Sequence, residues 1–345
     1  NPQWLLNFAI SGFPKCGTST LMHYFANNPE IHIHRDERCD LGYNQQVQLI
    51  RDLYQNFPSG DYIRGIKCPR DLENKLSLAN YQRFFPDTDM IIGLRHPILW
   101  FESFYNHRIQ NQFEMPHNLS SLIGACSKGT HGVCTNRAGF HVNLAMLGKT
   151  RPLKSPEERK WMPTFGIRYL TKFAVRLTGR IFLYEMEQLR DTGPQFRGDL
   201  QQFLKLKNPL PPIPWFRPGR QQQQSLTTTE TSIISDTRKT SPATFTNTTF
   251  SRTKMNICDD QYIKLRSILM RHARNASYWI RTYFLMAPDV TVSSPDWFVQ
   301  RLESWNQDPC EIRNNSAETH IINSNTTVMN CTDYGCFLAT KSPSP

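Results

Sequence analysis

The sequence predicts an α/β fold, in which a parallel sheet of about five strands is flanked by helices on both faces and followed by a C-terminal helical segment. Over residues 1–206, short apolar runs alternate with amphipathic stretches, a pattern typical of sheets whose strands are joined by helices. The chain has 345 residues, of which 39% are hydrophobic, so it has enough apolar side chains for a sizeable core.

Five apolar runs are expected to form the strands of this sheet, with helices between them. The expected strands are Leu6–Gly12, Ile31–His34, Tyr62–Cys68, Met90–Arg95 and Ile181–Met186. The expected helices are Thr18–Asn28, Asn44–Asn56, Leu76–Phe85, Pro97–Gln110, Pro156–Thr178 and Gln195–Leu206. Pro97 favours a helix start, because its missing N–H would have no partner in the first turn. Residues 256–284 carry spaced apolar side chains among charges, which predicts a long helix or a helix pair.

The composition changes after residue 206. Residues 208–250 contain a Pro-rich stretch and the low-complexity run QQQQSLTTTETS, which we interpret as a loop or disordered insert. We therefore expect one domain over residues 1–286 that contains this insert. The polar stretch 287–345 is expected to be a C-terminal extension outside that domain.

The chain is basic, with 40 Lys and Arg against 29 Asp and Glu, a formal net charge of +11 and a pI near 9.3. Such an excess favours anionic partners such as phosphorylated cofactors, acidic glycans, nucleic acid or membrane headgroups. A solvated basic surface without a dedicated partner is the alternative. No recognised nucleic-acid motif accompanies the basic residues of 251–281, so no nucleic-acid partner is expected.

The cysteines and glycosylation sequons favour a secretory compartment. Cys310, Cys331 and Cys336 crowd the C-terminal part of the chain, where we expect a disulfide. Three sequons lie beside them, beginning at Asn314, Asn325 and Asn330. No Cys and His spacing typical of zinc occurs, and no metal is expected. Neither a signal peptide nor an apolar run of about 18 residues is present, so we expect a targeting segment to have been trimmed from this chain.

The stretch SGFPKCGTST at residues 11–20 follows an expected strand and opens an expected helix. A turn of this kind gathers backbone N–H groups at a helix N-terminus, whose dipole favours an anion. Gly17 allows close approach of the backbone to a phosphate, and Lys15 adds a full charge. In the alternative, the Ser and Thr residues only cap the helix. The loop is P-loop-like, but an ATP-type P-loop carries its lysine after the second glycine, whereas Lys15 precedes Gly17.

The stretch LRHPILWFESFYNHR at residues 94–108 predicts a second anion site. Arg95 ends an expected strand, Pro97 opens a helix, and Ser103 lies about two turns along that helix. Arginine binds phosphate through two parallel N–H groups, and open parallel sheets bind ligands at the carboxyl ends of their strands. The alternative is an Arg95 that is paired with a carboxylate and a Ser103 that lies on the surface.

Together the two stretches resemble the donor site of sulfotransferases that use 3′-phosphoadenosine 5′-phosphosulfate (PAPS), and the glycan-modifying, heparan sulfate-type Golgi enzymes in particular. FPKCGTST is similar to the loop that binds the 5′-phosphosulfate, where the family's lysine contacts the oxygen bridging sulfur and phosphorus. Arg95, Pro97, Ser103 and Tyr105 are similar to the family's 3′-phosphate site. The resemblance implies donor binding by Lys15, Cys16, Gly17, Thr18, Ser19, Thr20, Arg95 and Ser103.

The resemblance also supplies candidates for the chemistry. Glu37, in HRDERCDL, stands where the glycan-modifying branch has the glutamate that removes the acceptor's proton, with Asp36 as a rival. Lys67, in IRGIKCPRD, stands where the family has a lysine near the sulfonate. The cytosolic branch has a histidine base two residues after that lysine, and Pro69 stands there in this chain. This departure favours Glu37 and a carbohydrate acceptor.

Two further parts of the sequence match the family's pattern less closely. A late basic loop of the family closes over the 3′-phosphate, and FSRTKMN at residues 250–256 is the candidate, with Arg252 and Lys254. The family's Gly-containing pattern is not reproduced there. Ser19 stands where many glycan sulfotransferases have arginine.

The resemblance implies a PAPS-dependent sulfotransferase, with Lys15, Glu37 and Lys67 as catalytic residues and adenosine 3′,5′-bisphosphate (PAP) as product. It further implies a hydroxyl-bearing acceptor, a polysaccharide or oligosaccharide, and a glycoprotein of the Golgi lumen held by a trimmed type II membrane anchor. One alternative is a P-loop-type small-molecule kinase, which needs a lysine after Gly17. The other is a non-catalytic glycan- or nucleic-acid-binding protein on the same fold.

Overall fold

The computed structural model describes residues 2–57, 60–116, 118–150, 160, 174–214, 250–251, 253–312, 330–332 and 335–337. The chain divides into two units, Asn1–Asn306 and Gln307–Pro345. The first unit contains the sheet, its helices and all the cavities discussed below. In the second unit, the described strands β9 (Asn330–Thr332) and β10 (Gly335–Phe337) form an antiparallel pair.

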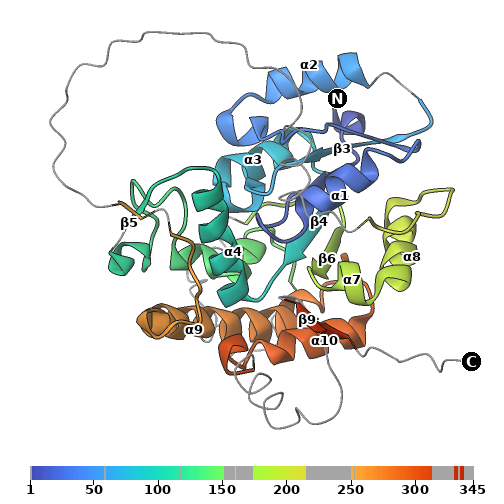
Figure 1. The fold of residues 1–345 in the computed structure, drawn as a ribbon. Helices are drawn as coiled ribbons and strands as arrows, with labels where there is room; N and C mark the ends of the chain where they lie inside the picture. The colour runs from blue at the N-terminus through green and yellow to red at the C-terminus, as the bar shows by residue number, and fades with distance from the viewer. Residues whose placement is uncertain are drawn as a thin grey trace, which may run out of the picture. The chain divides into compact units, whose positions relative to one another are not determined.

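The first unit is built on a parallel sheet of six strands in the order β2-β3-β1-β4-β6-β8, which confirms the α/β class (Figure 1). The strands are β1 Phe8–Ile10, β2 Ile31–Ile33, β3 Ile63–Lys67, β4 Asp89–Leu94, β6 Ile181–Glu185 and β8 Val290–Val292. Outside this sheet, β5 (Met115–Pro116) pairs antiparallel with β7 (Phe250–Ser251). Because the six strands are parallel, their carboxyl ends lie at one edge, where sheets of this type bind ligands.

Helices connect the strands and cover both faces of the sheet (Figure 1). They are α1 Thr18–Phe25, α2 Gln46–Asn56, α3 Lys75–Phe84, α4 Pro97–Gln110, α5 Phe140–Ala145, α7 Gln188–Asp191, α8 Gly193–Leu204, α9 Ile263–Trp279 and α10 Pro295–Ser304. Phe8 and Ile91 pack with α1 and α8 in one core cluster. Ala9 and Ile92 alternate with them along the strands and are also fully buried, so both faces of the sheet are covered.

Most of the expected elements are present among the described residues, with differences in three segments. The long helix expected from residue 256 begins at Ile263 and ends in a π-helical turn, Ile280–Phe284. Most of the helix expected at Pro156–Thr178 lies outside the described residues, and residues 174–178 are not helical. The described start of the insert, residues 208–214, packs on the domain: Asn208 donates to Glu30, and Tyr24 donates to the carbonyl of Pro211.

The C-terminal boundary differs from the expected one. Residues 290–292 form the sixth strand, β8, beside β6, and α10 follows, so the first unit continues to Asn306 rather than ending at 286. The expected polar extension over 287–345 therefore contains part of the sheet. β8 is three residues long, lies at the sheet edge and has no fully buried side chain, so it lacks the apolar run that revealed the other strands.

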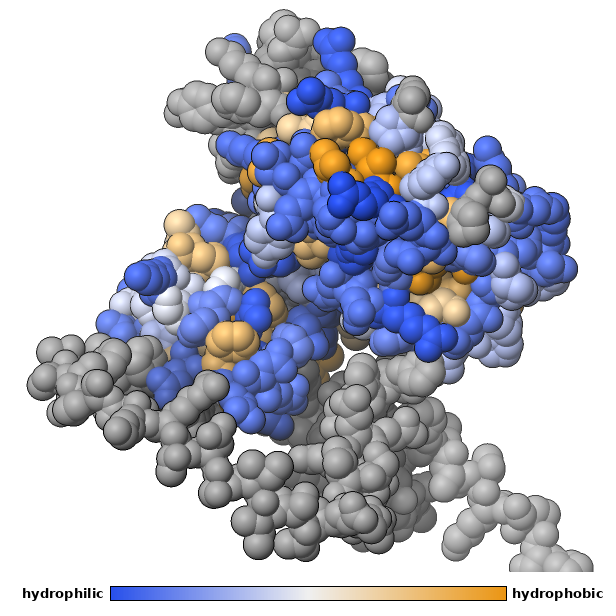
Figure 2. Space-filling model, turned by 90° about the horizontal axis from the view of Figure 1, so that it is seen from above, coloured by the Kyte–Doolittle hydropathy of each residue, from blue (hydrophilic) through white to orange (hydrophobic). Residues whose placement is uncertain are grey.

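In the view of Figure 2, hydrophilic residues cover most of the face, and apolar residues form small separate patches. None of the described helices is long and apolar enough to cross a membrane.

Two glycines hold the end of β1 against β4. A Cβ atom on Gly12 would lie 2.3 Å from the backbone nitrogen of Gly93. A Cβ atom on Gly93 would lie 2.6 Å from the carbonyl oxygen of Cys16. Both contacts would be with backbone atoms, which cannot rotate away as a side chain can. The loop after β1 therefore lies this close to β4 only because both positions are glycine.

We expect Gly12→Ala to lower the free energy of unfolding by about 1–3 kcal/mol, because the added methyl group forces β1 away from β4. Gly198→Ala is the matched control: this helical glycine has open space around its Cβ position, and alanine there is expected to stabilise the helix by about 0.5–1 kcal/mol. Chemical denaturation measures both. A Gly12→Ala protein as stable as the parent would contradict the packing.

Candidate active site

A cavity of about 400 Å³ opens at the carboxyl edge of the sheet, and we call it the donor cavity. Of the residues predicted from the sequence, it is lined by Lys15, Gly17, Thr18, Ser19, Thr20, Glu37, Lys67, Arg95 and Ser103. These residues come from four separate stretches of the chain, which follow β1, β2, β3 and β4. The fold therefore brings both predicted anion-binding stretches and the predicted carboxylate into one cavity.

The loop between β1 and α1 presents backbone N–H groups to this cavity. Lys15 and Gly17 both have left-handed backbones, with φ of 66° and 83°, which curl the chain before α1 begins at Thr18. No side chain among the described residues caps the first turn of α1, and no acidic residue stands in it. The loop is fixed from behind, because Trp100 donates to the carbonyl of Pro14 (2.7 Å) and Tyr184 to that of Cys16 (2.8 Å). This geometry suits an anion at the helix N-terminus.

Lys67 links the loop to the predicted carboxylate. Its side chain, only 3% exposed, donates from Nζ to Ser19 Oγ at 2.8 Å and to Glu37 Oε1 at 2.5 Å. The Glu37 side chain is 52% exposed, so its carboxylate is held at one end and open to solvent at the other. A buried ammonium needs such partners, because an unpaired buried charge is costly. Asp36, the rival of Glu37, is exposed and is absent from the cavity lining.

Arg95 and Ser103 approach the cavity from β4 and α4. Arg95 directly follows the last residue of β4, and Pro97 opens α4 after His96, whose Nδ1 accepts from the Ile98 N–H at 3.2 Å. Ser103 lies about two turns along this helix. Within the described part of the chain, neither Lys15 nor Arg95 forms an ion pair with a carboxylate. The alternative, in which Arg95 is paired with a carboxylate for structural reasons, is therefore not observed among the described residues.

The cations of the cavity perturb one another. Burial, followed by the charges of Arg95 and Lys67, lowers the pKa of Lys15. Burial, followed by the charges of Lys15 and Arg108, lowers the pKa of His107 to about 4, so its imidazole is neutral at pH 7. Such mutual repulsion is relieved by a bound anion, which makes this cavity electrostatically suited to a ligand with several negative charges.

Cys16 and the late basic loop are placed differently from the residues above. Cys16 is fully buried, its thiol faces the carbonyl of Pro14 at 3.7 Å, and burial raises its pKa. Its thiol is therefore unreactive, and only its backbone N–H remains a candidate donor. Lys254 is exposed and does not line the cavity, and Arg252 lies outside the described residues. The following residue, Met255, is anchored to α4 by two hydrogen bonds with Asn106, of 2.7 and 2.8 Å.

Several lining residues were not predicted from the sequence. Phe104, His107 and Arg108 lie on α4 near Ser103, and the i,i+4 spacing of Ser103 and His107 gave a signal for His107. Tyr105, part of the quoted motif, is buried instead, because it points to another side of the same helix. Arg70 and Arg137 also line the cavity, and no local sequence pattern predicts them: Arg70 lies in the turn after β3, and Arg137 lies in the short 3-10 helix Thr135–Ala138. Arg137 is held by Glu73, with Nε donating to Oε1 at 3.0 Å.

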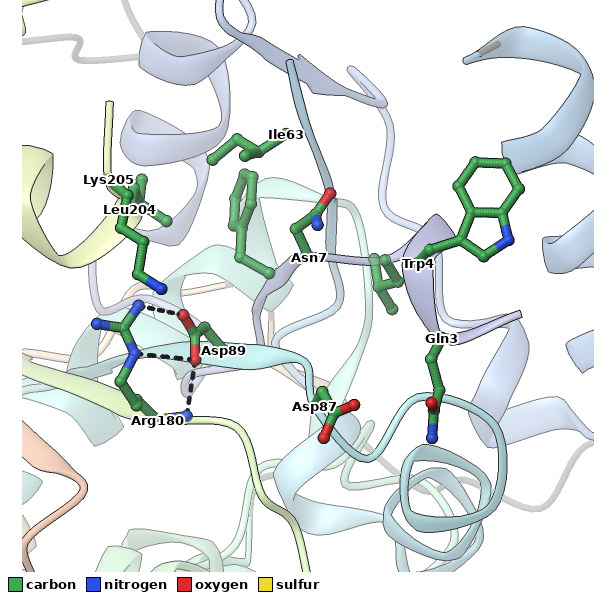
Figure 3. A pocket seen from close by; sticks show the side chains of 11 residues that line it. Gln3, Trp4, Asn7, Ile63, Asp87, Asp89, Arg180, Leu204 and Lys205 are labelled. Atoms are coloured by element: carbon green, nitrogen blue, oxygen red, sulfur yellow. Dashed lines mark hydrogen bonds and ion pairs between the residues drawn. The ribbon is translucent and has the colours of Figure 1, made fainter. Parts of the chain in front are cut away.

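A cavity of about 510 Å³ lies at the opposite, amino-terminal edge of the sheet (Figure 3). None of the predicted site residues lines it. Figure 3 shows its best-placed charges, Arg180 and Asp89, bonded to each other, with Arg180 Nη2 2.5 Å from Asp89 Oδ2. Their pairing leaves little charge for a ligand, so the donor cavity is the stronger candidate.

No protein-family model matches the chain. No curated protein matches it either. Among solved structures, the chain is similar to the crystal structure of a sulfotransferase from Alicyclobacillus acidocaldarius, with a TM-score of 0.41 and 16% sequence identity. The alignment covers 80% of this chain and 96% of that chain.

The electrostatics of the donor cavity are testable without any ligand. The imidazole of His107 is expected to titrate near 4 and to shift upward in Lys15→Met, because that variant removes one of the charges that lower its pKa. The pKa should stay below 6.5 in the variant, since burial, the largest cause, remains. NMR titration of the histidine side chains measures both values. An unchanged His107 in Lys15→Met, or a shift of equal size in the exposed Arg83→Met control, would contradict the proposed geometry.

Proposed function

We propose that this protein is a sulfotransferase that moves a sulfuryl group from PAPS to a hydroxyl of a carbohydrate acceptor, releasing PAP. The observation that carries the proposal is the donor cavity, where Lys15, Arg95 and the Lys67–Glu37 pair line one space. Two unpaired cations and an uncapped helix N-terminus suit a nucleotide with negative charge at both ends. The lone carboxylate of the lining suits removal of a proton.

In this proposal, the loop after β1 binds the phosphosulfate through its backbone N–H groups and Lys15. Arg95 and Ser103 bind the 3′-phosphate. Fixed donors and cations of this kind stabilise charge that develops in a transition state, and losing one typically costs a factor of about 10²–10³ in rate. Lys15 neutralises the bridging oxygen as its bond to sulfur breaks.

The acceptor hydroxyl attacks sulfur in line with the departing oxygen. A new O–S bond forms, the old O–S bond breaks with its electron pair staying on the phosphate of PAP, and Glu37 accepts the hydroxyl proton. General-base catalysis of this kind contributes a factor of about 10²–10⁴. We assign to Lys67, which is bonded to Glu37 and Ser19, the neutralisation of charge on the transferring group.

The alternatives fit the residues less well. A P-loop kinase needs a lysine after Gly17 and carboxylates for magnesium, whereas Thr18 follows Gly17 and Glu37 is the one carboxylate among the lining residues described. A non-catalytic binding protein would use the anion loop but would not need the half-exposed carboxylate of Glu37 beside it for chemistry. We therefore favour the sulfotransferase.

We place the protein in the Golgi lumen or another secretory compartment, as a glycoprotein held through a type II membrane anchor. Two disulfides support an oxidising compartment: Cys39–Cys68 and Cys126–Cys134. Cys310, one of the three cysteines near the C-terminus, is also disulfide-bonded, and the disulfide expected among those three stays a prediction. Among the described residues, no cluster of three or more His, Cys, Asp or Glu side chains is arranged for a metal, and the proposal uses none.

Glu37→Gln is expected to lower sulfate transfer by a factor of about 10²–10⁴ while leaving PAP affinity within about twofold, because the amide keeps the shape but accepts no proton. Transfer of radiolabelled sulfate from PAPS to polysaccharides, small alcohols and tyrosine peptides measures turnover, and calorimetry measures PAP binding. Asp36→Asn is the matched control and should keep full activity. Loss of PAP binding in Glu37→Gln would mean that its role is misassigned.

Nucleotide binding distinguishes the sulfotransferase from the kinase alternative. PAP at about 100 times its Kd should add about 2.7 kcal/mol of stability, whereas ADP with magnesium should add little. Stabilisation by ADP with magnesium alone would overturn the sulfotransferase in favour of a kinase.

A further inference from the structure

The disulfide Cys39–Cys68 joins the two chain segments that carry the candidate catalytic pair, Glu37 and Lys67. Cys39 lies two residues after Glu37, and Cys68 directly follows Lys67. The carboxylate of Glu37 and the ammonium of Lys67 form an ion pair between the same two segments. A covalent bond therefore connects the backbone within two residues of each partner of this ion pair.

The two ends of the disulfide are held differently. Lys67 pairs with Ile10 in the parallel ladder of β1 and β3, and the N–H of Cys68 donates to the carbonyl of Ile10 at 3.1 Å. Cys68 is only 1% exposed. The other end belongs to the segment after β2, in which residues 35–37 are all exposed. The disulfide thus ties an exposed segment to a fixed strand of the sheet.

Other contacts of this segment are less able to fix its distance from β3. The N–H of Arg38 donates to the carbonyl of Lys67 at 2.9 Å, but a single backbone hydrogen bond is weak beside a covalent bond. The guanidinium of Arg38 bonds Asp40 at 3.0 Å and Asp52 at 2.7 Å. Asp40 belongs to the same segment and Asp52 to α2, so neither contact reaches β3.

We propose that Cys39–Cys68 is a positioning element of the reaction, which holds the Glu37 carboxylate where it takes the proton of the acceptor hydroxyl. This inference rests on the proposed function. With the disulfide open, Lys67 stays at the end of β3, whereas Glu37 moves with its exposed segment. The base is then displaced, while the donor loop after β1 keeps its own hydrogen bonds to the core.

The double variant Cys39→Ala/Cys68→Ala is expected to lose about tenfold or more in kcat, with PAP affinity within about twofold, because a displaced base slows the chemical step. The loss should be non-additive with that of Glu37→Gln, because both changes remove the same base. Leu302→Ala, at a fully buried position in α10, controls for lowered stability and should keep the parental kcat below its melting temperature.

A parental kcat in the double variant, or a loss that adds to that of Glu37→Gln, would overturn the inference. A Glu37→Gln protein with the parental kcat would instead remove the base from the proposed function, and this inference with it.

Reduction of the parent gives a reversible form of the same test. Dithiothreitol transfers two electrons and two protons to the disulfide and becomes a cyclic disulfide itself, and alkylation with mass spectrometry shows when Cys39–Cys68 has opened. The kcat should then fall as in the double variant and return on reoxidation. The double variant keeps Cys126–Cys134, so its kcat should not respond. An equal fractional loss there would assign the effect to the other disulfide and contradict the inference.

An independent observation concerns the glycosylation sequon Asn118-Leu119-Ser120, at the start of the short 3-10 helix Leu119–Leu122. Asn118 and Ser120 are both exposed. Oδ1 of Asn118 accepts from the N–H of Ser120 at 3.0 Å and from its hydroxyl at 2.7 Å. This turn uses three consecutive residues, so it forms without the rest of the domain. It holds the serine hydroxyl against the amide whose Nδ2 is the glycan acceptor.

The sequon that begins at Asn275 has a different setting. It lies within α9, where Ala276 and Ser277 are fully buried. The hydroxyl of Ser277 donates to the carbonyl of Leu302 at 2.5 Å. The serine of this sequon is therefore engaged in the core, and its backbone is helical.

We infer that Asn118 carries an N-linked glycan and that Asn275 does not, an inference that rests on the proposed secretory compartment. In the transfer, Nδ2 of Asn118 bonds the anomeric carbon of an oligosaccharide carried on a lipid diphosphate. The bond from that carbon to the phosphate oxygen breaks with its electron pair staying on the phosphate, and Nδ2 loses one proton to solvent.

The chain is expressed behind a secretory signal sequence in eukaryotic cells, so that the result does not depend on its own targeting or on sulfate transfer. Peptide mass spectrometry, with and without peptide N-glycosidase treatment, should find a glycan on Asn118. Ser120→Ala should abolish this glycan and Ser120→Thr should retain it. Asn275→Gln is the matched control and should leave it unchanged. An unmodified Asn118, or a glycan on Asn275, would overturn the inference.

Discussion

Unneutralised positive charge at one edge of the sheet is the constraint on which the rest of this structure depends. Lys15, Arg95 and Arg108 lack carboxylate partners among the described residues, although each is partly buried. Burial, and after it the charges of neighbouring cations, lowers the pKa of Lys15 and of His107. Burying charge without a partner costs free energy, which the packing of the rest of the fold must offset.

The backbone around β1 and β4 makes this concentration of charge possible. Gly12 and Gly93 let the loop after β1 lie directly on β4, so Lys15 and Arg95 leave neighbouring strands at the same edge. Trp100 and Tyr184 then hold the loop by its carbonyl groups and leave its N–H groups to face the cavity. The placement of the candidate binding residues thus depends on residues that do not line the cavity.

The sequence predicted what is encoded locally. The loop at residues 11–20 and the strand–helix junction at Arg95 are continuous stretches, whose turns and helix starts follow from neighbouring residues, and both lie where expected. Arg137 was missed because it is distant in the sequence from the other cavity residues, and the Cys39–Cys68 disulfide was missed because a single sequence does not show which cysteines pair. The strand β8 was missed because three half-exposed residues at a sheet edge carry no apolar pattern. Contacts that form only through tertiary packing leave no local pattern in a single sequence.

Several arginines away from the expected ligand contacts are paired with carboxylates. Arg38 bonds Asp40 and Asp52, Arg180 bonds Asp89, and Arg137 bonds Glu73. Each of these arginines has its carboxylate within the fold, as a buried or half-buried cation requires. The cations around the donor cavity that lack a carboxylate partner depart from that pattern within the same protein. Where a sequence leaves charges unpaired in a cavity while pairing comparable ones elsewhere, the missing partner is most simply an anion supplied by the ligand.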